Sequence, residues 1–267
     1  MSHSLSPALH NAAFAALGLD LVYVPLPVKA PALGAAIGGL TALGLRGANV
    51  TVPHKGAVLP YLTWLDADAR AAEAANTIVV DGAELRGYNT DVEGVRAALA
   101  EVCGETLRGA SGLLLGAGGA ARAAALALTR LGVELTVVNR TAAAAERLVA
   151  LTSAAVPGAS VAWQPLSELT AADVRSRRIL VNATSLGMAG AGKVPAALAD
   201  NVTAGHVVFD VVYSLGDTDL LARARAGGAI VVDGLSMLVH QAAVAFTLWT
   251  GEPAPLEVMR DAIAQGH

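Results

Sequence analysis

The chain has 267 residues, of which 54% are hydrophobic and 15% are charged, and its formal net charge is −4 at pH 7. This composition excludes an intrinsically disordered chain, and the length favours two domains. The sequence has no basic tract suited to following a phosphate backbone, so we expect no nucleic-acid partner.

Two uncharged runs, residues 30–45 and 235–251, raise the question of a membrane segment. Both are shorter than the roughly 20 apolar residues that a membrane-spanning helix needs. We therefore expect no membrane partner, and we expect no metal cofactor. Cys103 is the only cysteine, so no intrachain disulfide can form, and the sequence is typical of a protein of the reducing cytoplasm.

The first 91 residues predict an α/β unit. Strand-like apolar runs cover residues 20–28, 47–53 and 76–80, and helix-compatible stretches cover residues 31–45 and 65–75. Elements that alternate in this way pack as layers of helices on a sheet.

The pattern becomes more regular from residue 111 onward. A short strand is followed by an alanine-rich helix, and further strands are predicted over residues 133–138, 178–184, 206–213 and 229–234. This alternation indicates parallel β-α-β winding. Residues 235–265 predict two helices interrupted at residues 251–255, with Pro253 opening the second helix.

A glycine-rich turn separates the first regular strand from the helix that follows it. Amides at the start of a helix carry partial positive charge, and glycine lets a phosphate approach the backbone. The turn therefore predicts binding of a dinucleotide pyrophosphate; the alternative is a tight strand-to-helix turn without a ligand. Its residues are Gly116, Ala117, Gly118, Gly119 and Ala120.

The end of the next strand carries Asn139, Arg140 and Thr141. NAD-binding folds place an acidic residue at this point, on the ribose 2′-hydroxyl. A carboxylate repels a 2′-phosphate, whereas a guanidinium pairs with it in bidentate fashion. We therefore predict NADP(H) over NAD, although Arg140 taken alone fits a solvated surface charge as well.

A set of short motifs runs in order along nearly the whole chain: "HSLSPALHN", "GANVTVPHK", "EAANTIV", "GYNTD", "GAGGAARA", "NRT", "NATSLGM", "DVVY" and "DGLSMLVHQAA". Together they resemble the shikimate dehydrogenase family. The resemblance implies reduction of 3-dehydroshikimate to shikimate with NADPH, in the biosynthesis of chorismate and aromatic amino acids. It also implies an α/β substrate-binding domain over residues 1–91 and 235–267, to which the C-terminal helices return, and a Rossmann-type NADP-binding domain over residues 92–234.

The resemblance assigns roles to individual residues. Lys55 and Asp91 are expected to form the catalytic proton relay, since a lysine ammonium can stabilise the charge that grows on a reduced carbonyl oxygen and donate the proton. Ser4 and Ser6 are expected to bind the substrate carboxylate, with both hydroxyls on one side of an extended segment. The other expected substrate contacts are Asn49, Thr51, Asn76, Tyr213 and Gln241, and the other expected cofactor contacts are Thr184 and Met237.

Several of these residues have structural alternatives. Ser6 before Pro7 has the pattern of a helix N-cap, and Gln241 in an apolar helix fits a hydrogen bond to the backbone. For the whole protein, the alternatives are an NAD-dependent quinate/shikimate dehydrogenase and a homologue that binds shikimate without turnover. The sequence is compatible with a monomer or a homodimer.

Two departures from the family pattern matter most. Members that bind NADP often carry a second arginine a few positions after "NRT", where this chain has Ala144, so Arg140 is left as the main phosphate partner. Members also usually carry about ten residues before "HSLSP" that form a first strand. We expect upstream residues, if encoded in frame, to raise the melting temperature and tighten substrate binding.

Overall fold

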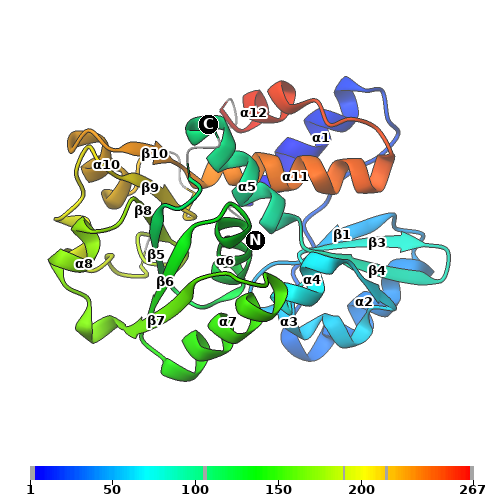
Figure 1. Ribbon diagram of the computed structural model, residues 1–267. Coiled ribbons are helices and arrows are strands. Elements are labelled where there is room, and N and C mark those ends of the chain that lie inside the picture. The colour runs from blue at the N-terminus through cyan, green and yellow to red at the C-terminus, as the bar shows by residue number, and fades with distance from the viewer. Residues whose placement is uncertain (1–3, 105–106, 189, 214–215, 265–267) are drawn as a thin grey trace. The chain divides into compact units, whose positions relative to one another are not determined.

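The computed structural model describes residues 4–104, 107–188, 190–213 and 216–264 (Figure 1). The chain divides into two compact units. The first unit comprises Met1–Gly94 and Val239–His267, and the second comprises Val95–Leu238. The boundaries fall inside two helices, α5 (Thr90–Cys103) and α11 (Gly234–Thr250).

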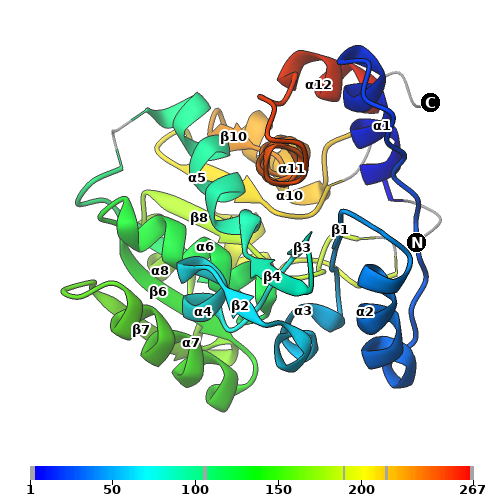
Figure 2. The same ribbon diagram turned by 90° about the vertical axis from the view of Figure 1, so that its right-hand side faces the viewer.

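The first unit is built on a four-stranded mixed sheet in the order β1-β3-β4-β2. The β3–β4 hairpin is antiparallel, β1 adds to it antiparallel, and β2 adds parallel. Helices α1, α11 and α12 lie on one side of this sheet, and α2 and α3 lie on the other (Figure 2). The strands are β1 (Gly47–Asn49), β2 (Trp64–Leu65), β3 (Thr77–Asp81) and β4 (Glu84–Tyr88). The other helical elements are α1 (Ser6–Ala16), η1 (Ala30–Ala32), α2 (Leu33–Ala42), α3 (His54–Ala57), η2 (Leu59–Tyr61), α4 (Ala67–Ala72) and α12 (Leu256–Ala264).

An aromatic cluster joins α1 to α11 and to the sheet. The His10 ring stacks on Tyr23 with 4.7 Å between ring centroids, and it lies 5.1 Å from the Trp249 ring. The Trp249 indole N–H donates to the Ile78 carbonyl oxygen of β3 at 2.9 Å. A Cβ at Gly47 would overlap both the Trp249 indole and that carbonyl, so glycine lets the indole cross β1 closely.

Three local expectations for this unit are wrong. Residues 20–28 are extended but form no strand, because Pro25 and Pro27 lack the N–H that a ladder needs. Residues 47–53 form a strand only over β1. The second C-terminal helix begins at Leu256, and the Pro255 carbonyl, not Pro253, starts its hydrogen-bonding.

The second unit contains a six-stranded parallel sheet in the order β10-β9-β8-β5-β6-β7. Chain order reverses between β5 and β8, which is the switch point of a doubly wound dinucleotide-binding sheet. The prediction of an α/β fold with a Rossmann-type domain is confirmed. The strands are β5 (Ser111–Leu115), β6 (Glu134–Asn139), β7 (Val161–Pro165), β8 (Ile179–Asn182), β9 (Val207–Asp210) and β10 (Ile230–Val232).

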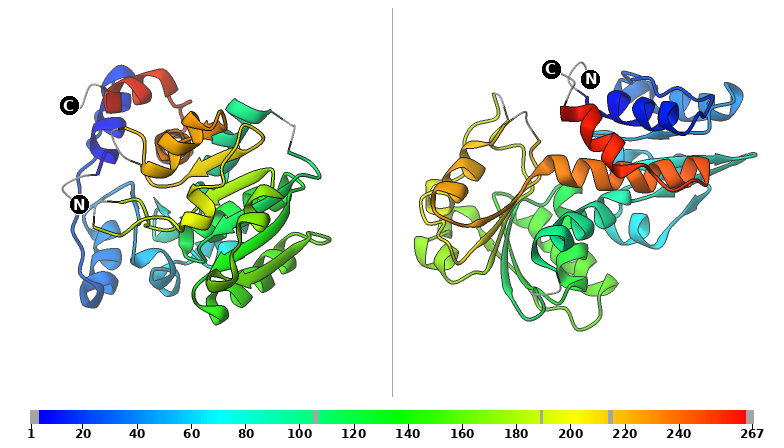
Figure 3. Two further views of the ribbon diagram at one scale, coloured as in Figure 1. Left: turned by 90° about the vertical axis from the view of Figure 1, so that its left-hand side faces the viewer. Right: turned by 90° about the horizontal axis from the view of Figure 1, so that it is seen from above.

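Helices cover both faces of the parallel sheet. Helices α8 and α10 lie on one face, and α6 and α7 lie on the other (Figure 3). The core beneath α8, α9 and α10 includes Val174, Leu198 and Leu221, which pack against buried residues of β5, β8 and β9. These helical elements are α6 (Gly119–Arg130), α7 (Ala142–Ala155), η3 (Leu166–Glu168), α8 (Ala171–Arg175), α9 (Ala196–Ala199) and α10 (Asp219–Ala226). Across the described parts of both units, no helix combines the length and the apolar character needed to cross a bilayer.

The buried imidazole of His10 predicts an acid sensitivity of the fold. Burial lowers the pKa of His10 from 6.5 to about 4, and the neighbouring Asn49 side chain offsets only part of this shift. The unfolded chain takes up this proton below about pH 6.5, while the native state resists it. The contribution of neutral His10 to the free energy of unfolding is therefore complete above pH 6.5. It is lost as the pH falls from 6.5 towards 4, and the total loss is roughly 3 kcal/mol.

His10→Phe keeps a flat ring in the cluster and removes the titrating group. We expect the free energy of unfolding of this variant to fall less steeply than that of the wild type between pH 7 and pH 4.5, measured by urea titration at each pH. Parallel curves for the two proteins contradict the assignment to His10.

Candidate active site

A partly buried ion pair lies among the polar residues of the first unit. The Lys55 ammonium donates to Asp91 Oδ2 at 2.5 Å. The Asp91 side chain is 5% exposed and that of Lys55 is 18% exposed. The contact expected between Lys55 and Asp91 is thus present, with the lysine on the more accessible side; its catalytic role stays a prediction.

The β3–β4 hairpin explains why these residues meet. Thr77 pairs with Tyr88 in its ladder, so Asn76 and the segment 89–91 leave the same end of the hairpin side by side. The Asn76 N–H extends the ladder by donating to the Tyr88 carbonyl at 3.0 Å. The Ala75 N–H donates to the Lys55 carbonyl at 2.9 Å, which ties α3 to the same point.

Asn76 organises this cluster. Its side chain is buried, and its Nδ2 donates to Asp91 Oδ1 at 2.9 Å and lies 3.2 Å from Gln241 Oε1. Its Oδ1 accepts from the Thr90 N–H at 2.7 Å. Asp91 therefore uses one carboxylate oxygen for Asn76 and the other for Lys55. Gln241 reaches the cluster from α11 through side chains, since its Oε1 also lies 3.4 Å from Thr90 Oγ1.

Asn49 links the cluster to a residue that the sequence analysis missed. Its Oδ1 accepts from the Tyr23 hydroxyl at 3.0 Å, and its Nδ2 donates to Thr77 Oγ1 at 3.0 Å. Burial raises the pKa of Tyr23 to about 12, so the hydroxyl keeps the proton that it donates. Tyr23 is the one hydroxyl-bearing side chain in the apolar run 20–28, and this was the sequence feature that could have marked it as a partner for a polar group. The Asn11 side chain holds the Tyr23 backbone, because its Oδ1 accepts from the Tyr23 N–H at 2.7 Å and its Nδ2 donates to the Tyr23 carbonyl at 3.0 Å.

The two serines near the N-terminus differ from both of their expected arrangements. Leu5, with φ −83° and ψ −13°, is helical, so Ser4 and Ser6 do not lie on an extended segment. Ser6 is the first residue of α1 and the N-cap is Leu5, with no side-chain capping bond, so the capping alternative is wrong. His3, which opens the same motif, lies outside the described residues. Thr51 is exposed.

The glycine turn of the second unit has the features that a pyrophosphate needs. Gly116 adopts φ +111°, and a Cβ there would come within 2.9 Å of the Thr184 side chain. Gly118 is the N-cap of α6, and a Cβ there would meet nothing within 4 Å. No side chain caps the helix, so the first-turn amides beside this open space remain available for an anion.

Arg140 lies at the same edge of the parallel sheet as the glycine turn. Strands β5 and β6 are adjacent, with Leu115 opposite Val138, so the residues that follow each strand are neighbours. Asn139 ends β6, and its side-chain Nδ2 donates to the Thr141 carbonyl at 2.9 Å. This bond shapes the turn into α7. The Arg140 side chain is exposed.

The predicted cofactor contacts Thr184 and Met237 follow β8 and β10, and the predicted substrate contact Tyr213 follows β9. The Thr184 hydroxyl donates to Asn182 Oδ1 at 2.7 Å and accepts from the Leu186 N–H at 3.1 Å, so it is bonded within its own loop. Met237 is buried in α11. Tyr213 was expected to close a strand, but β9 ends at Asp210 because the chain there turns onto the Asp210 carboxylate.

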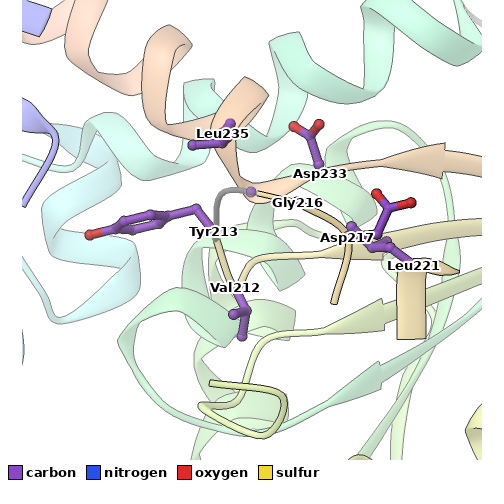
Figure 4. A pocket seen from close by; sticks show the side chains of 8 residues that line it. Val212, Tyr213, Gly216, Asp217, Leu221, Asp233 and Leu235 are labelled. Atoms are coloured by element: carbon purple, nitrogen blue, oxygen red, sulfur yellow. The ribbon is translucent and has the colours of Figure 1, made fainter. Parts of the chain in front are cut away.

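Tyr213 lines a small pocket at the ends of β9 and β10. Its ring extends away from the Asp217 and Asp233 carboxylates, which lie on the other side of the pocket (Figure 4). The ring is 43% exposed, as expected of a side chain that meets a ligand or solvent.

Comparison with known proteins identifies the family. Residues 1–78 match the shikimate dehydrogenase substrate binding domain, and residues 234–264 match the shikimate 5'-dehydrogenase C-terminal domain. A shikimate dehydrogenase (NADP(+)) of Methanothermobacter thermautotrophicus is 44% identical, covering 98% of this chain and 92% of the relative. The chain belongs to the shikimate dehydrogenase family.

Solved structures of shikimate dehydrogenases and related enzymes share this fold. A shikimate dehydrogenase in complex with NADP+ is 38% identical, with a TM-score of 0.91, covering 99% of this chain and 92% of that chain. Quinate dehydrogenase from Corynebacterium glutamicum in complex with NAD is 33% identical, with a TM-score of 0.89, covering 98% and 94%. Fold and family are therefore those that the motifs predicted.

The cluster around Asn76 predicts a stability effect. In Asn76→Ala, the buried Asp91 Oδ1 and the Thr90 N–H lose their partner, so we expect the free energy of unfolding to fall by about 1–3 kcal/mol. Asn201→Ala is the control, because that side-chain amide bonds the Ala197 carbonyl and the exposed Arg175 near the surface, and its loss should cost less than about 1 kcal/mol. Urea titration measures both; equal losses contradict the central position of Asn76.

Proposed function

We propose that this chain catalyses the NADPH-dependent reduction of 3-dehydroshikimate to shikimate. The observation that carries the proposal is the Lys55–Asp91 pair, held at 2.5 Å in a buried cluster of amides and hydroxyls, in a chain of the shikimate dehydrogenase family. The NADP(+)-dependent relative is 44% identical over nearly the whole chain, which supports the same activity here.

NADPH, when bound, supplies a hydride to the ring carbonyl carbon. The chain's own task is then to manage the negative charge that grows on the carbonyl oxygen. The Lys55 ammonium stabilises this charge and donates a proton from Nζ to the oxygen. Asp91 Oδ2 holds Nζ in place, and Asn76 holds the opposite carboxylate oxygen, so the donor is oriented before the substrate arrives.

The substrate is a small ring with a carboxylate and several hydroxyls. In the proposed complex, Asn76, Asp91 and Gln241 bind ring hydroxyls, with Asn49 and Thr51 beside them. Ser4 and Ser6 bind the carboxylate. The support is the convergence of amide and hydroxyl groups around Asn76, which exceeds what a buried core needs.

The residues of the second unit fit NADP(H). The uncapped start of α6 and the open space at Gly118 suit the pyrophosphate, with Ala117, Gly119 and Ala120 completing the turn. Arg140, with Asn139 and Thr141 on either side, suits the 2′-phosphate. Thr184 and Met237 are proposed to line the nicotinamide end, Thr184 through its backbone because its hydroxyl is already bonded. Tyr213 is proposed to bind the substrate beside the nicotinamide.

Lys55→Ala tests the proton donor. We expect kcat/KM for 3-dehydroshikimate to fall about 10²- to 10⁴-fold, followed as NADPH oxidation, because the general acid is gone. The affinity for shikimate should change far less, measured by calorimetry. Lys29→Ala, which removes an exposed lysine of the same unit, should keep the wild-type rate. A Lys55→Ala protein with wild-type turnover refutes the role of Lys55.

Arg140→Ala tests the choice of cofactor. We expect the wild type to prefer NADPH over NADH, and the variant to lose kcat/KM with NADPH by about tenfold or more, while the value with NADH stays within about twofold. Arg175→Ala, at an exposed arginine bonded to Asn201, is the control. A wild type that prefers NADH overturns the proposal and supports the NAD-dependent alternative.

The likeness to a quinate dehydrogenase keeps quinate as a second candidate substrate. Turnover of quinate with NAD in the same assay decides this point. Binding of shikimate without turnover identifies a non-catalytic homologue instead. We also propose a cytoplasmic enzyme that is a monomer or a homodimer, which light scattering after gel filtration distinguishes.

A further inference from the structure

A buried carboxylate in the second unit has no part in the chemistry described above. Asp210, the last residue of β9, is fully buried, and among the described residues no cation pairs with it. Burial raises the pKa of its carboxyl group. Burying a carboxylate among neutral groups costs free energy unless hydrogen bonds compensate for the lost water.

Three neutral donors surround the Asp210 carboxylate. Asn182 Nδ2 donates to Oδ1 at 2.9 Å, the Val212 N–H donates to Oδ1 at 3.1 Å, and the Thr218 hydroxyl donates to Oδ2 at 2.6 Å. A carboxylate accepts on both oxygens, and an alanine at position 210 would leave all three donors without this acceptor.

The three donors come from three separate segments. Asn182 ends β8 and lies opposite Asp210 in the parallel ladder. Val212 belongs to the segment that leads to Tyr213. Thr218 is the N-cap of α10 and accepts from the Leu221 N–H at 3.3 Å. One side chain thus joins the carboxyl ends of two neighbouring strands to the start of a helix.

The bond to Asn182 continues towards the glycine turn. Asn182 Oδ1 accepts from the Thr184 hydroxyl at 2.7 Å and lies 3.2 Å from the Thr184 N–H. Thr184 in turn packs so closely on Gly116 that a Cβ there would come within 2.9 Å of its methyl group. Asp210 is therefore connected, through Asn182 and Thr184, to the turn assigned to the pyrophosphate, and through Val212 to the pocket that Tyr213 lines (Figure 4).

We propose that Asp210 is a positioning residue for the cofactor, which sets the loop 183–188 and the segment 211–213 at one fixed spacing around the nicotinamide end of the site. The inference rests on the proposed function, because it assumes that these segments hold NADP(H). Asp210 itself is buried beneath them and acts only through Asn182, Val212 and Thr218.

The test compares Asp210→Ala and Thr218→Val with the wild type. Asp210→Ala removes all three bonds of the carboxylate, Thr218→Val removes one of them, and both leave the first unit unchanged. We expect the Kd for NADPH, from the fluorescence of the bound cofactor, and the KM for NADPH to rise about tenfold. The Kd for shikimate should stay within about twofold.

Two further variants separate positioning from stability. Thr218→Ser keeps the hydroxyl and should restore the wild-type Kd for NADPH. Thr170→Val removes the N-cap of α8 in the same unit, where the Thr170 hydroxyl accepts from the Asp173 N–H, so it should lower the melting temperature without changing NADPH binding. If Asp210→Ala does not fold, the Thr218 pair carries the comparison.

The outcomes are distinct. NADPH binding that is unchanged in Asp210→Ala and Thr218→Val, even with a lower melting temperature, overturns the positioning role and leaves a structural one. The positioning role is also overturned if Thr218→Ser weakens NADPH binding as much as Thr218→Val does. A wild type that neither binds NADPH nor oxidises it with 3-dehydroshikimate refutes the proposed function instead, whatever the variants do.

Discussion

The candidate active site depends on stabilising one carboxylate, Asp91, whose side chain is only 5% exposed. A buried ion pair is stable only when hydrogen bonds satisfy the lone pairs that the partner cation leaves open. Asp91 meets this condition with Lys55 on one oxygen and Asn76 on the other. That requirement explains why the β3–β4 hairpin, α3, α5 and α11 all converge on Asn76. Each supplies a group that the pair or its neighbours need.

The two units meet different chemical demands with different parts. In the proposed function, the first unit binds a polyhydroxylated ring through side-chain amides and hydroxyls, because such a ring offers many hydrogen-bonding groups. The second unit offers a pyrophosphate the backbone amides at the start of α6, because that group needs several donors and space close to the chain. The glycines follow from the second strategy: Gly116 is required by φ +111° and by the nearby Thr184, whereas Gly118 leaves open space.

The sequence predicted the features that a local residue pattern determines. Short apolar strands that alternate with helices led to the parallel sheet, and spaced motifs led to Lys55, Asp91 and Asn76. Three features were not predicted, for different physical reasons. Residues 20–28 have the composition of a strand, but Pro25 and Pro27 lack the N–H groups that a ladder needs. Ser6 has the pattern of a cap, but the helix already begins at Ser6, with Leu5 as its N-cap. Tyr23 was missed because its contact with Asn49 spans 26 residues and follows no period.

Asp91 and Asp210 show how surroundings assign different tasks to one residue type. Asp91 pairs with Lys55, whose side chain is partly exposed. In the proposed function, a substrate can therefore reach the Lys55 ammonium while Asp91 holds it in place. Asp210 faces only neutral donors in the described part of the second unit and is shielded from solvent, so it has no proton donor to orient. Its bonds fix three backbone segments instead. A carboxylate with a cation at its open side is suited to chemistry, and one enclosed by neutral donors is suited to holding a loop.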